Sequence, residues 1–285
     1  MSIGKKFRRI RMGLQTVFNL NPQGFFIPYR YAGPVRGDAP YPAHKPLFDA
    51  ARPTMQAVLA GLADIRDDLT AIGDRPPPEP RWGQDWFPRL DAAIGYAMVR
   101  RRKPARLVEV GSGHSTRFYR RAARDAGLST AITAIDPAPR ADLSALDDIT
   151  LVCKTVQDAD PAVFDGLAAG DILAIDSSHI LMPGTDVDEL LNRVLPCLPA
   201  GLHVHIHDMF LPDAYPPHWA WRGYNEQNAV AALLAGGGYT IDWASHYAVE
   251  TGLLDGPGGE VVKALPLPDG AVETSLWLTK TAAAL

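Results

Sequence analysis

The side chains best suited to chemistry lie in two short stretches, "ILAIDSSH" and "HVHIHD". Asp176 and His179 close the first stretch, and His207 and Asp208 close the second. A histidine of near-neutral pKa can take a proton from a hydroxyl, so His179 is the candidate general base, with Asp176 and Asp208 as further catalytic candidates. An alternative role for Asp176 is to bond a cofactor amine or to cap the following turn.

The same residues could also hold a divalent metal ion. The expected ligands are Asp176, His207 and Asp208, because carboxylates suit Mg²⁺. The histidine among them shifts the preference toward Mn²⁺, Fe²⁺ or Zn²⁺. His203, His205 and His207 alternate on one face of a strand, which also fits a metal-dependent hydrolase. In a parallel sheet, however, His203 and His205 are expected to pack under helices with bonded nitrogens.

A second pattern, "VEVGSGHST", combines a carboxylate with two glycines at a strand-to-helix junction. Gly111 and Gly113 would let a ligand approach the backbone closely. Glu109 would repel a pyrophosphate, and Thr116 replaces the third glycine of a dinucleotide loop, so an NAD-dependent oxidoreductase is the less favoured alternative. A positively charged ligand fits better. Asp136 in "IDPAPR" ends the next strand, where an acid can bond ribose hydroxyls.

The elements that must position these groups are compact apolar runs separated by helical or loop segments. They are "RLVEV", "TAITAID", "ITLVCKT", "DILAID" and "LHVHIHD", and they predict a parallel sheet covered on both faces. The last two runs, "YTIDWASHY" and "TSLWLTK", are joined by a Gly/Pro-rich loop and predict an antiparallel hairpin at the sheet edge. Ligands of such sheets bind beyond the carboxyl ends of the strands, where the acids and histidines fall.

The motifs "EVGSGHSTRF", "IDPAPR", "DILAIDSSH" and "HVHIHDMFLP", in this order, resemble those of a bacterial family of class I S-adenosylmethionine-dependent methyltransferases. The resemblance runs from about "GFFIPYRY" to the end of the chain. It implies an α/β, Rossmann-like class I methyltransferase fold: a mostly parallel seven-stranded sheet with an antiparallel last strand, plus an N-terminal helical and loop extension. It implies the cofactor S-adenosyl-L-methionine and cofactor contacts from Glu109, Gly111, Ser112, Gly113, His114, Asp136, Pro137, Val156, Gln157, Asp176 and Ser177.

The expected acceptor is a hydroxyl of a small molecule or sugar, because a hydroxyl needs the base that His179 supplies. The aromatic, proline-punctuated loop "FLPDAYPPHWAWRGYNEQ" is the expected source of specificity. Its candidate substrate contacts are Tyr215, Trp221, Arg222, Asn225 and Glu226, together with Trp219. Asn225 has the alternative role of capping the helix that follows.

Chain length, net charge and cysteine content bear on the location of the protein, its partners and its domains. The chain has 285 residues, a net charge of −4 and two cysteines without metal-site spacing, which predicts a reduced, cytoplasmic protein that does not bind nucleic acid. We expect an extension over residues 1–80, ending in a triple proline, and a methyltransferase domain over 81–285. The basic, amphipathic N-terminus predicts a helix packed on the body or a basic tail; membrane association is the less favoured interpretation. Homo-oligomerisation is left open.

Overall fold

The computed structural model describes residues 3–139, 143 and 146–285, and these divide into two compact units, Met1–Gly37 and Asp38–Leu285. The expected extension over 1–80 therefore comprises the first unit and a segment, 38–80, that belongs to the second. No helix in the described part of the chain has the length and apolar character needed to span a membrane.

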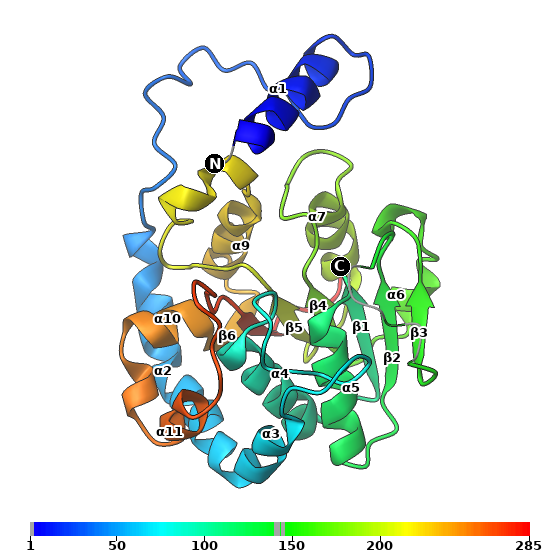
Figure 1. The fold of residues 1–285 in the computed structure, drawn as a ribbon, viewed down its shortest axis with the longest axis vertical. Helices are drawn as coiled ribbons and strands as arrows, with labels where there is room; N and C mark the ends of the chain where they lie inside the picture. The colour runs from blue at the N-terminus through cyan, green and yellow to red at the C-terminus, as the bar shows by residue number, and fades with distance from the viewer. Residues whose placement is uncertain (1–2, 140–142, 144–145) are drawn as a thin grey trace. The chain divides into compact units, whose positions relative to one another are not determined.

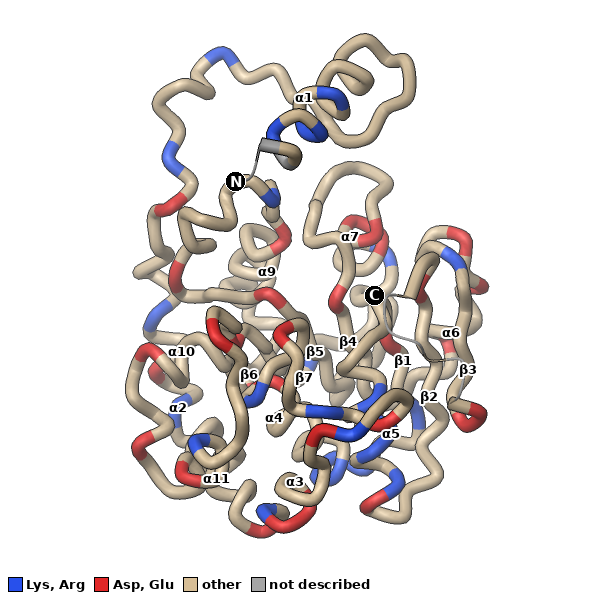
Figure 2. Tube along the Cα trace, in the orientation of Figure 1, with Lys and Arg blue, Asp and Glu red and all other residues tan. Residues whose placement is uncertain are grey.

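The second unit is built on a seven-stranded sheet with the order β3-β2-β1-β4-β5-β7-β6. Figure 1 labels β3, β2, β1, β4, β5 and β6 across this sheet, and Figure 2 also labels β7. The strands are β1 (Arg106–Val110), β2 (Ala131–Ile135), β3 (Ile149–Val152), β4 (Ile172–Ile175), β5 (His203–Ile206), β6 (Tyr239–Ala244) and β7 (Leu276–Lys280). β1 to β5 pair in parallel, and β7 runs antiparallel to both β5 and β6. The predicted parallel sheet and antiparallel last strand are confirmed. The connection between β6 and β7 contains short helices, so the pair is not a simple hairpin.

Helical segments precede β1 and also lie between most pairs of successive strands, as the alternating pattern predicts. They are α1 (Ile3–Val17), η1 (Pro42–His44), α2 (Lys45–Ala60), η2 (Gly61–Ile65), α3 (Arg66–Ile72), α4 (Arg89–Arg102), α5 (His114–Asp125), η3 (Val156–Asp158), α6 (Ala162–Asp165), α7 (Asp186–Glu189), η4 (Leu190–Val194), α8 (Leu195–Cys197), η5 (Pro217–Arg222), α9 (Glu226–Ala235), α10 (Ser245–Glu250), η6 (Leu253–Asp255) and α11 (Gly259–Lys263).

The central strands are buried along their whole length, which explains their continuous apolar runs. Every residue of β4 and β5 is buried, including two histidines of the alternating set. His203 Nδ1 lies 2.9 Å from Thr279 Oγ1, and His205 lies 2.9 Å from both the Tyr119 hydroxyl and Ser275 Oγ. Both histidines thus pack in the core, His205 with both ring nitrogens bonded and His203 with its Nδ1 bonded.

Candidate functional site

The glycine turn after β1 brings the ends of β1 and β4 into direct contact. The Asp176 backbone nitrogen donates to Val110 O at 2.9 Å. Gly111 has a φ of +85°, and a Cβ there would lie 1.8 Å from the Asp176 carbonyl oxygen. Only glycine fits this position, because a side chain would meet both the unfavourable φ and the neighbouring strand. The turn and the acid–histidine group therefore form one continuous site.

The neighbouring turn residues leave open space and bond Asp136. Ser112 donates to Asp136 Oδ2 from its backbone nitrogen at 2.9 Å and from its hydroxyl at 3.1 Å. A Cβ on Gly113 would meet no atom within 4 Å. Asp136 is partly exposed at the end of β2, and its Oδ1 accepts from the Ala138 backbone nitrogen at 2.8 Å. The carboxylate thus couples the ends of β1 and β2 while one edge of the turn stays accessible.

Glu109 is enclosed instead of exposed. It is 1% exposed, and its two carboxyl oxygens accept from the hydroxyls of Ser115 and Thr116 in the first turn of α5. Burial raises the pKa of Glu109 to about 8; the two hydroxyls lower it, and the charges of Asp176 and Asp136 raise it further. The carboxyl group therefore fastens the start of α5 to β1, and its predicted contact with the cofactor stays a prediction.

The other predicted cofactor residues surround this turn at different depths. His114 begins α5, and burial, with Arg117 and Arg81 nearby, lowers its pKa to about 4. Val156 is buried in η3, whereas Gln157 is exposed and donates to Gly184 O at 3.0 Å. Pro137 is exposed after β2, and the hydroxyl oxygen of Ser177 is buried after β4 without a hydrogen-bond partner.

Residues at the start of α9 hold His179 in position through its ring and its backbone carbonyl. Its Nδ1 lies 2.9 Å from Oε2 of Glu226, a residue with 0% exposure. Its carbonyl oxygen accepts from the backbone nitrogens of Asn225 and Glu226, at 3.0 and 3.2 Å. Carboxylates face both ring nitrogens, which favours the imidazolium form. When His179 is neutral, the shorter contact with Glu226 favours a proton on Nδ1 and leaves Nε2 as the basic atom. The φ of +60° at His179 is strained for a non-glycine residue, a feature common at functional sites.

The Nε2 atom of His179 faces the two strand-end aspartates. It lies 3.3 Å from Asp176 Oδ1 and 3.5 Å from Asp208 Oδ2. The Asp176 side chain is 33% exposed, so this group opens to solvent on its Asp176 side. Burial lowers the pKa of His179, but the bonds to Asp176 and Glu226 and the charge of Asp208 outweigh it and hold that pKa well above 6.5.

His207 bridges the aspartates to a buried acid that the sequence interpretation did not include. Its Nδ1 lies 3.6 Å from Asp176 and 3.5 Å from Asp208, and its Nε2 lies 3.2 Å from Asp91 Oδ2. Asp91 on α4 also accepts from the backbone nitrogens of Thr274 and Ser275, each at 2.9 Å. A lone acid inside the apolar helix "RLDAAIGYAMV" was the available signal, because a fully buried carboxylate requires partners.

The three expected metal ligands, Asp176, His207 and Asp208, therefore do come together. Even so, the described residues contain no group of three or more His, Cys, Asp or Glu side chains arranged to hold a metal ion. The donor atoms face one another in acid–imidazole pairs, and His207 and His179 together lower the pKa of Asp176 against the opposing effect of burial. The metal expectation is not confirmed, and it stays a prediction.

The predicted substrate loop forms an aromatic group beside His179. The Tyr224 ring lies 4.5 Å from the His179 ring, and Arg222 donates to the Tyr224 hydroxyl at 2.9 Å. The Arg222 guanidinium stacks 4.1 Å from the Trp219 ring. Tyr215 packs against Trp219 with its hydroxyl oxygen buried. Tyr224, absent from the predicted set, is the ring nearest the candidate base.

Three other predicted substrate residues differ in their surroundings. Trp221 is exposed. The Asn225 side chain bonds both backbone groups of Leu181, at 2.6 and 3.1 Å, and so ties the loop after β4 to α9. Glu226 lies under His179 without exposure, because it is the first residue of α9 and points into the site's floor. Asn225 and Glu226 thus act on the position of the loop and of His179.

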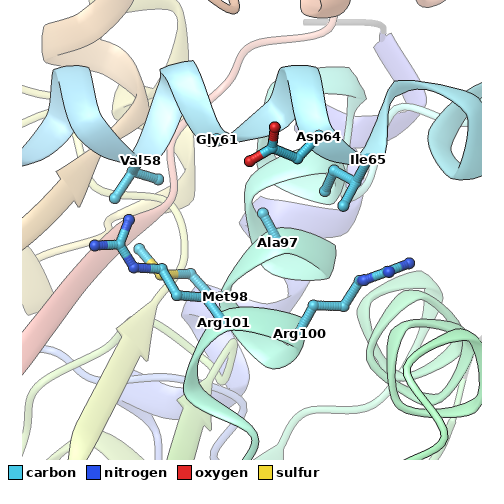
Figure 3. A pocket seen from close by; sticks show the side chains of 8 residues that line it. All are labelled: Val58, Gly61, Asp64, Ile65, Ala97, Met98, Arg100 and Arg101. Carbon is cyan, nitrogen blue, oxygen red and sulfur yellow. The ribbon is translucent and has the colours of Figure 1, made fainter.

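A pocket of about 300 Å³ lies elsewhere, between α4 and the α2–η2 segment (Figure 3). Its lining residues are Val58, Gly61, Asp64, Ile65, Ala97, Met98, Arg100 and Arg101. None of them belongs to the carboxyl ends of the strands, and Arg100 is engaged with Asp68. We therefore assign no chemistry to this pocket.

Comparison with known proteins gives one family match. Residues 108–209, from β1 to just beyond β5, match a family described as a methyltransferase domain. No curated protein matches the chain.

Solved structures with a similar arrangement are distant from this chain. They include the SAH-bound Podospora anserina methyltransferase PaMTH1, with 15% identity, a TM-score of 0.44 and coverage of 91% of this chain and 100% of that chain. The plantazolicin methyltransferase BpumL in complex with SAH has 12% identity, a TM-score of 0.43 and coverage of 84% and 99%. The Burkholderia thailandensis 1,6-didemethyltoxoflavin-N1-methyltransferase has 16% identity, a TM-score of 0.39 and coverage of 90% and 99%.

The class of the fold follows from the sheet itself. Five parallel strands, an order that reverses at β1/β4 and an antiparallel β7 between β5 and β6 form a Rossmann-like sheet. This is the class I methyltransferase arrangement that the sequence resemblance implies. The glycine turn and the acid–histidine group both lie at the carboxyl ends of the parallel strands, where this class of fold binds ligands.

Proposed function

We propose that this protein is an S-adenosylmethionine-dependent methyltransferase that acts on a hydroxyl of a small molecule or sugar. The observation that carries the proposal is the close approach of the Gly111 turn to Asp176, whose Oδ1 also lies 3.3 Å from His179 Nε2. The methyltransferase-domain match over residues 108–209 supports the same activity.

The residues present fit the cofactor. The turn offers open space at Gly113 and a close backbone approach at Gly111, and Asp136 can accept from ribose hydroxyls. The acids around the turn favour a ligand with a positive sulfonium and amino group. S-adenosylmethionine, when bound, supplies a methyl group whose carbon accepts the attacking oxygen as its bond to sulfur breaks, which leaves a neutral thioether.

Residues of this chain then remove the proton of the acceptor hydroxyl. Glu226 holds the Nδ1 proton of His179, so that Nε2 takes the proton of the acceptor hydroxyl as the new carbon–oxygen bond forms. Asp176 and Asp208 face Nε2 and stabilise the imidazolium that results. Tyr224 and the Trp219–Arg222 stack offer an aromatic surface for the acceptor beside the base.

A screen with methyl-labelled S-adenosylmethionine and a panel of hydroxylated sugars and phenols tests this proposal. We expect transfer of the label to at least one hydroxyl and matched formation of S-adenosylhomocysteine. Label found only on nitrogen or sulfur acceptors would overturn the hydroxyl assignment. Repeating the assay with EDTA and then with Mg²⁺ or Mn²⁺ tests whether Asp176, His207 and Asp208 act with a divalent metal.

A further inference from the structure

The first compact unit has an apolar face with a cationic border. Along α1, Phe7, Ile10, Leu14 and Val17 recur at spacings of three and four residues, which places them in one stripe along the helix. Their exposed fractions range from 53% to 71%, although side chains of this kind are ordinarily buried. An apolar stripe that its own unit leaves uncovered indicates a surface that binds a partner.

Charge along the same unit has a single sign. Residues 1–37 contain seven Lys and Arg and no Asp or Glu, although the chain as a whole is acidic. Figure 2 shows these cations along α1 and the segment that follows it. On α1, Lys6 and Arg11 fall on the two borders of the apolar stripe by helical geometry, and Arg8 and Arg9 fall on the far side. Cations bordering an apolar stripe match the anionic headgroups above a bilayer's acyl chains.

A second exposed apolar segment follows the helix. Its exposed side chains are Phe25, Phe26, Ile27, Tyr29, Tyr31 and Val35, and each is more than half exposed. Arg30 lies over the Tyr31 ring, 5.8 Å from its centroid. Aromatic rings with polar tips and cations beside them are typical of the water–bilayer boundary. The composition of this segment therefore agrees with that of α1.

We propose that residues 1–37 bind the surface of an anionic lipid bilayer, with the α1 stripe in the interface plane and its cations on lipid phosphates. A second copy of the chain is a poorer occupant, because two units that each carry seven cations and no anion repel one another. Nucleic acid would use the cations but would leave the apolar stripe exposed. The proposal is independent of the methyltransferase activity.

Vesicle flotation of the full chain tests this surface. We expect binding to vesicles of phosphatidylcholine mixed with phosphatidylglycerol and at least about tenfold weaker binding to phosphatidylcholine alone, with binding to the mixed vesicles weakening as salt rises. The variant Phe7→Ser/Ile10→Ser/Leu14→Ser should bind the mixed vesicles about tenfold more weakly or worse, since it loses the apolar area. Lys6→Gln/Arg8→Gln/Arg9→Gln/Arg11→Gln should lose the preference for anionic lipid.

Matched controls separate this surface from general stickiness. Val249→Ser/Leu267→Ser removes exposed apolar side chains from the second unit and should bind vesicles like the wild type. Phe7→Leu/Ile10→Leu keeps the stripe apolar and should also bind, and unchanged thermal unfolding would confirm that the second unit is intact. The proposal would be overturned if the wild type failed to bind anionic vesicles, or if the triple-serine variant bound them like the wild type. It would also be overturned if the triple-serine substitution only dissociated a dimer, or if the wild type bound RNA more tightly than vesicles.

Discussion

His179 and Glu226 are 47 positions apart in the chain, yet His179 Nδ1 and Glu226 Oε2 are 2.9 Å apart in the floor of the site. The contact favours a proton on Nδ1 in the neutral imidazole, and Nε2 faces the two strand-end aspartates. Two backbone bonds from the start of α9 to the His179 carbonyl hold the same geometry. This geometry is what the proposed base requires: a carboxylate that orients the imidazole.

Replacing His179 should remove turnover while cofactor binding persists. His179→Asn is expected to lower kcat by about 10²- to 10⁴-fold, because the acceptor proton loses its receiver. Affinity for S-adenosylhomocysteine should change less than about threefold, because the cofactor turn does not depend on the imidazole. Steady-state kinetics and calorimetry measure the two effects. His246→Asn, which removes a histidine paired with Asp213 on the surface, is the control and should retain normal kcat. Normal turnover by His179→Asn would exclude the base role.

Replacing Glu226 should change the pH profile as well as the rate. The pKa of His179 is raised by its carboxylate neighbours, so the neutral, basic form accumulates only above the ordinary pKa of 6.5. Glu226→Gln removes one negative charge and should shift the rising limb of kcat/KM by about one unit toward lower pH. The plateau should fall about tenfold or more, because the Nδ1 proton is held less firmly.

The pH limb distinguishes this positioning role from a purely structural one. Glu226→Asp, which keeps the charge, should leave the limb near its wild-type pH, whereas a structural role would lower the rate in both variants without moving it. Asp213→Asn, beside His246, is the control for loss of a carboxylate near a different histidine. A limb that stays in place in Glu226→Gln would contradict the pairing.

The two glycines of the turn should respond oppositely to a methyl group. Gly111→Ala places a Cβ 1.8 Å from the Asp176 carbonyl and imposes an unfavourable φ, so unfolding free energy should fall by about 3 kcal/mol or more. Gly113→Ala meets no atom within 4 Å and should fold normally, with weaker cofactor binding if the open space holds the cofactor. Thermal or denaturant unfolding measures the difference. Equal stability of the two variants would contradict the close contact between β1 and β4.

Glu109 should make stability depend on pH in a defined window. Burial raises the pKa of Glu109 from 4.5 to about 8, so its contribution to stability is complete below pH 4.5 and is lost as pH rises to about 8. The side chain introduced by Glu109→Gln does not titrate. The free energy of unfolding of this variant, relative to that of the wild type, should therefore rise by up to about 1.4 kcal/mol per pH unit across that window. Urea unfolding at several pH values tests this, with Glu250→Gln on the surface as the control. A constant difference between Glu109→Gln and wild type would contradict the raised pKa.

The sequence predicted the sheet well because each strand has its own local signal. The apolar centre of "DILAID" became β4, and the run "LHVHIHD", rich in Leu, Val and Ile, became β5. The rule that ligands meet strand ends placed Asp176, His179 and Asp208 together. The prediction of an antiparallel last strand agreed with β7 because "TSLWLTK" also carries a local strand signal. Local apolar patterning and chain connectivity were sufficient for these features.

Partnerships between distant segments could not be predicted in the same way. Glu226 looked like a substrate contact in a loop, and only the packing of α9 beneath the loop after β4 shows it bonded to His179. Asp91 lies 116 positions from His207 and was hidden within an apolar helix. The position of Glu109 in the motif predicted a contact with a ligand, but its carboxyl group accepts hydrogen bonds from two hydroxyls of α5. Each of these facts depends on which side chain fills a three-dimensional space.

Calorimetric titration of the purified protein with S-adenosylhomocysteine and with NAD⁺ tests the central claim most directly. The account predicts one binding site for S-adenosylhomocysteine, no measurable binding of NAD⁺, and binding weakened about tenfold or more by Asp136→Ala, which removes a charged hydrogen-bond acceptor. Absence of binding by S-adenosylhomocysteine, or preferential binding of NAD⁺, would contradict the assignment as a methyltransferase.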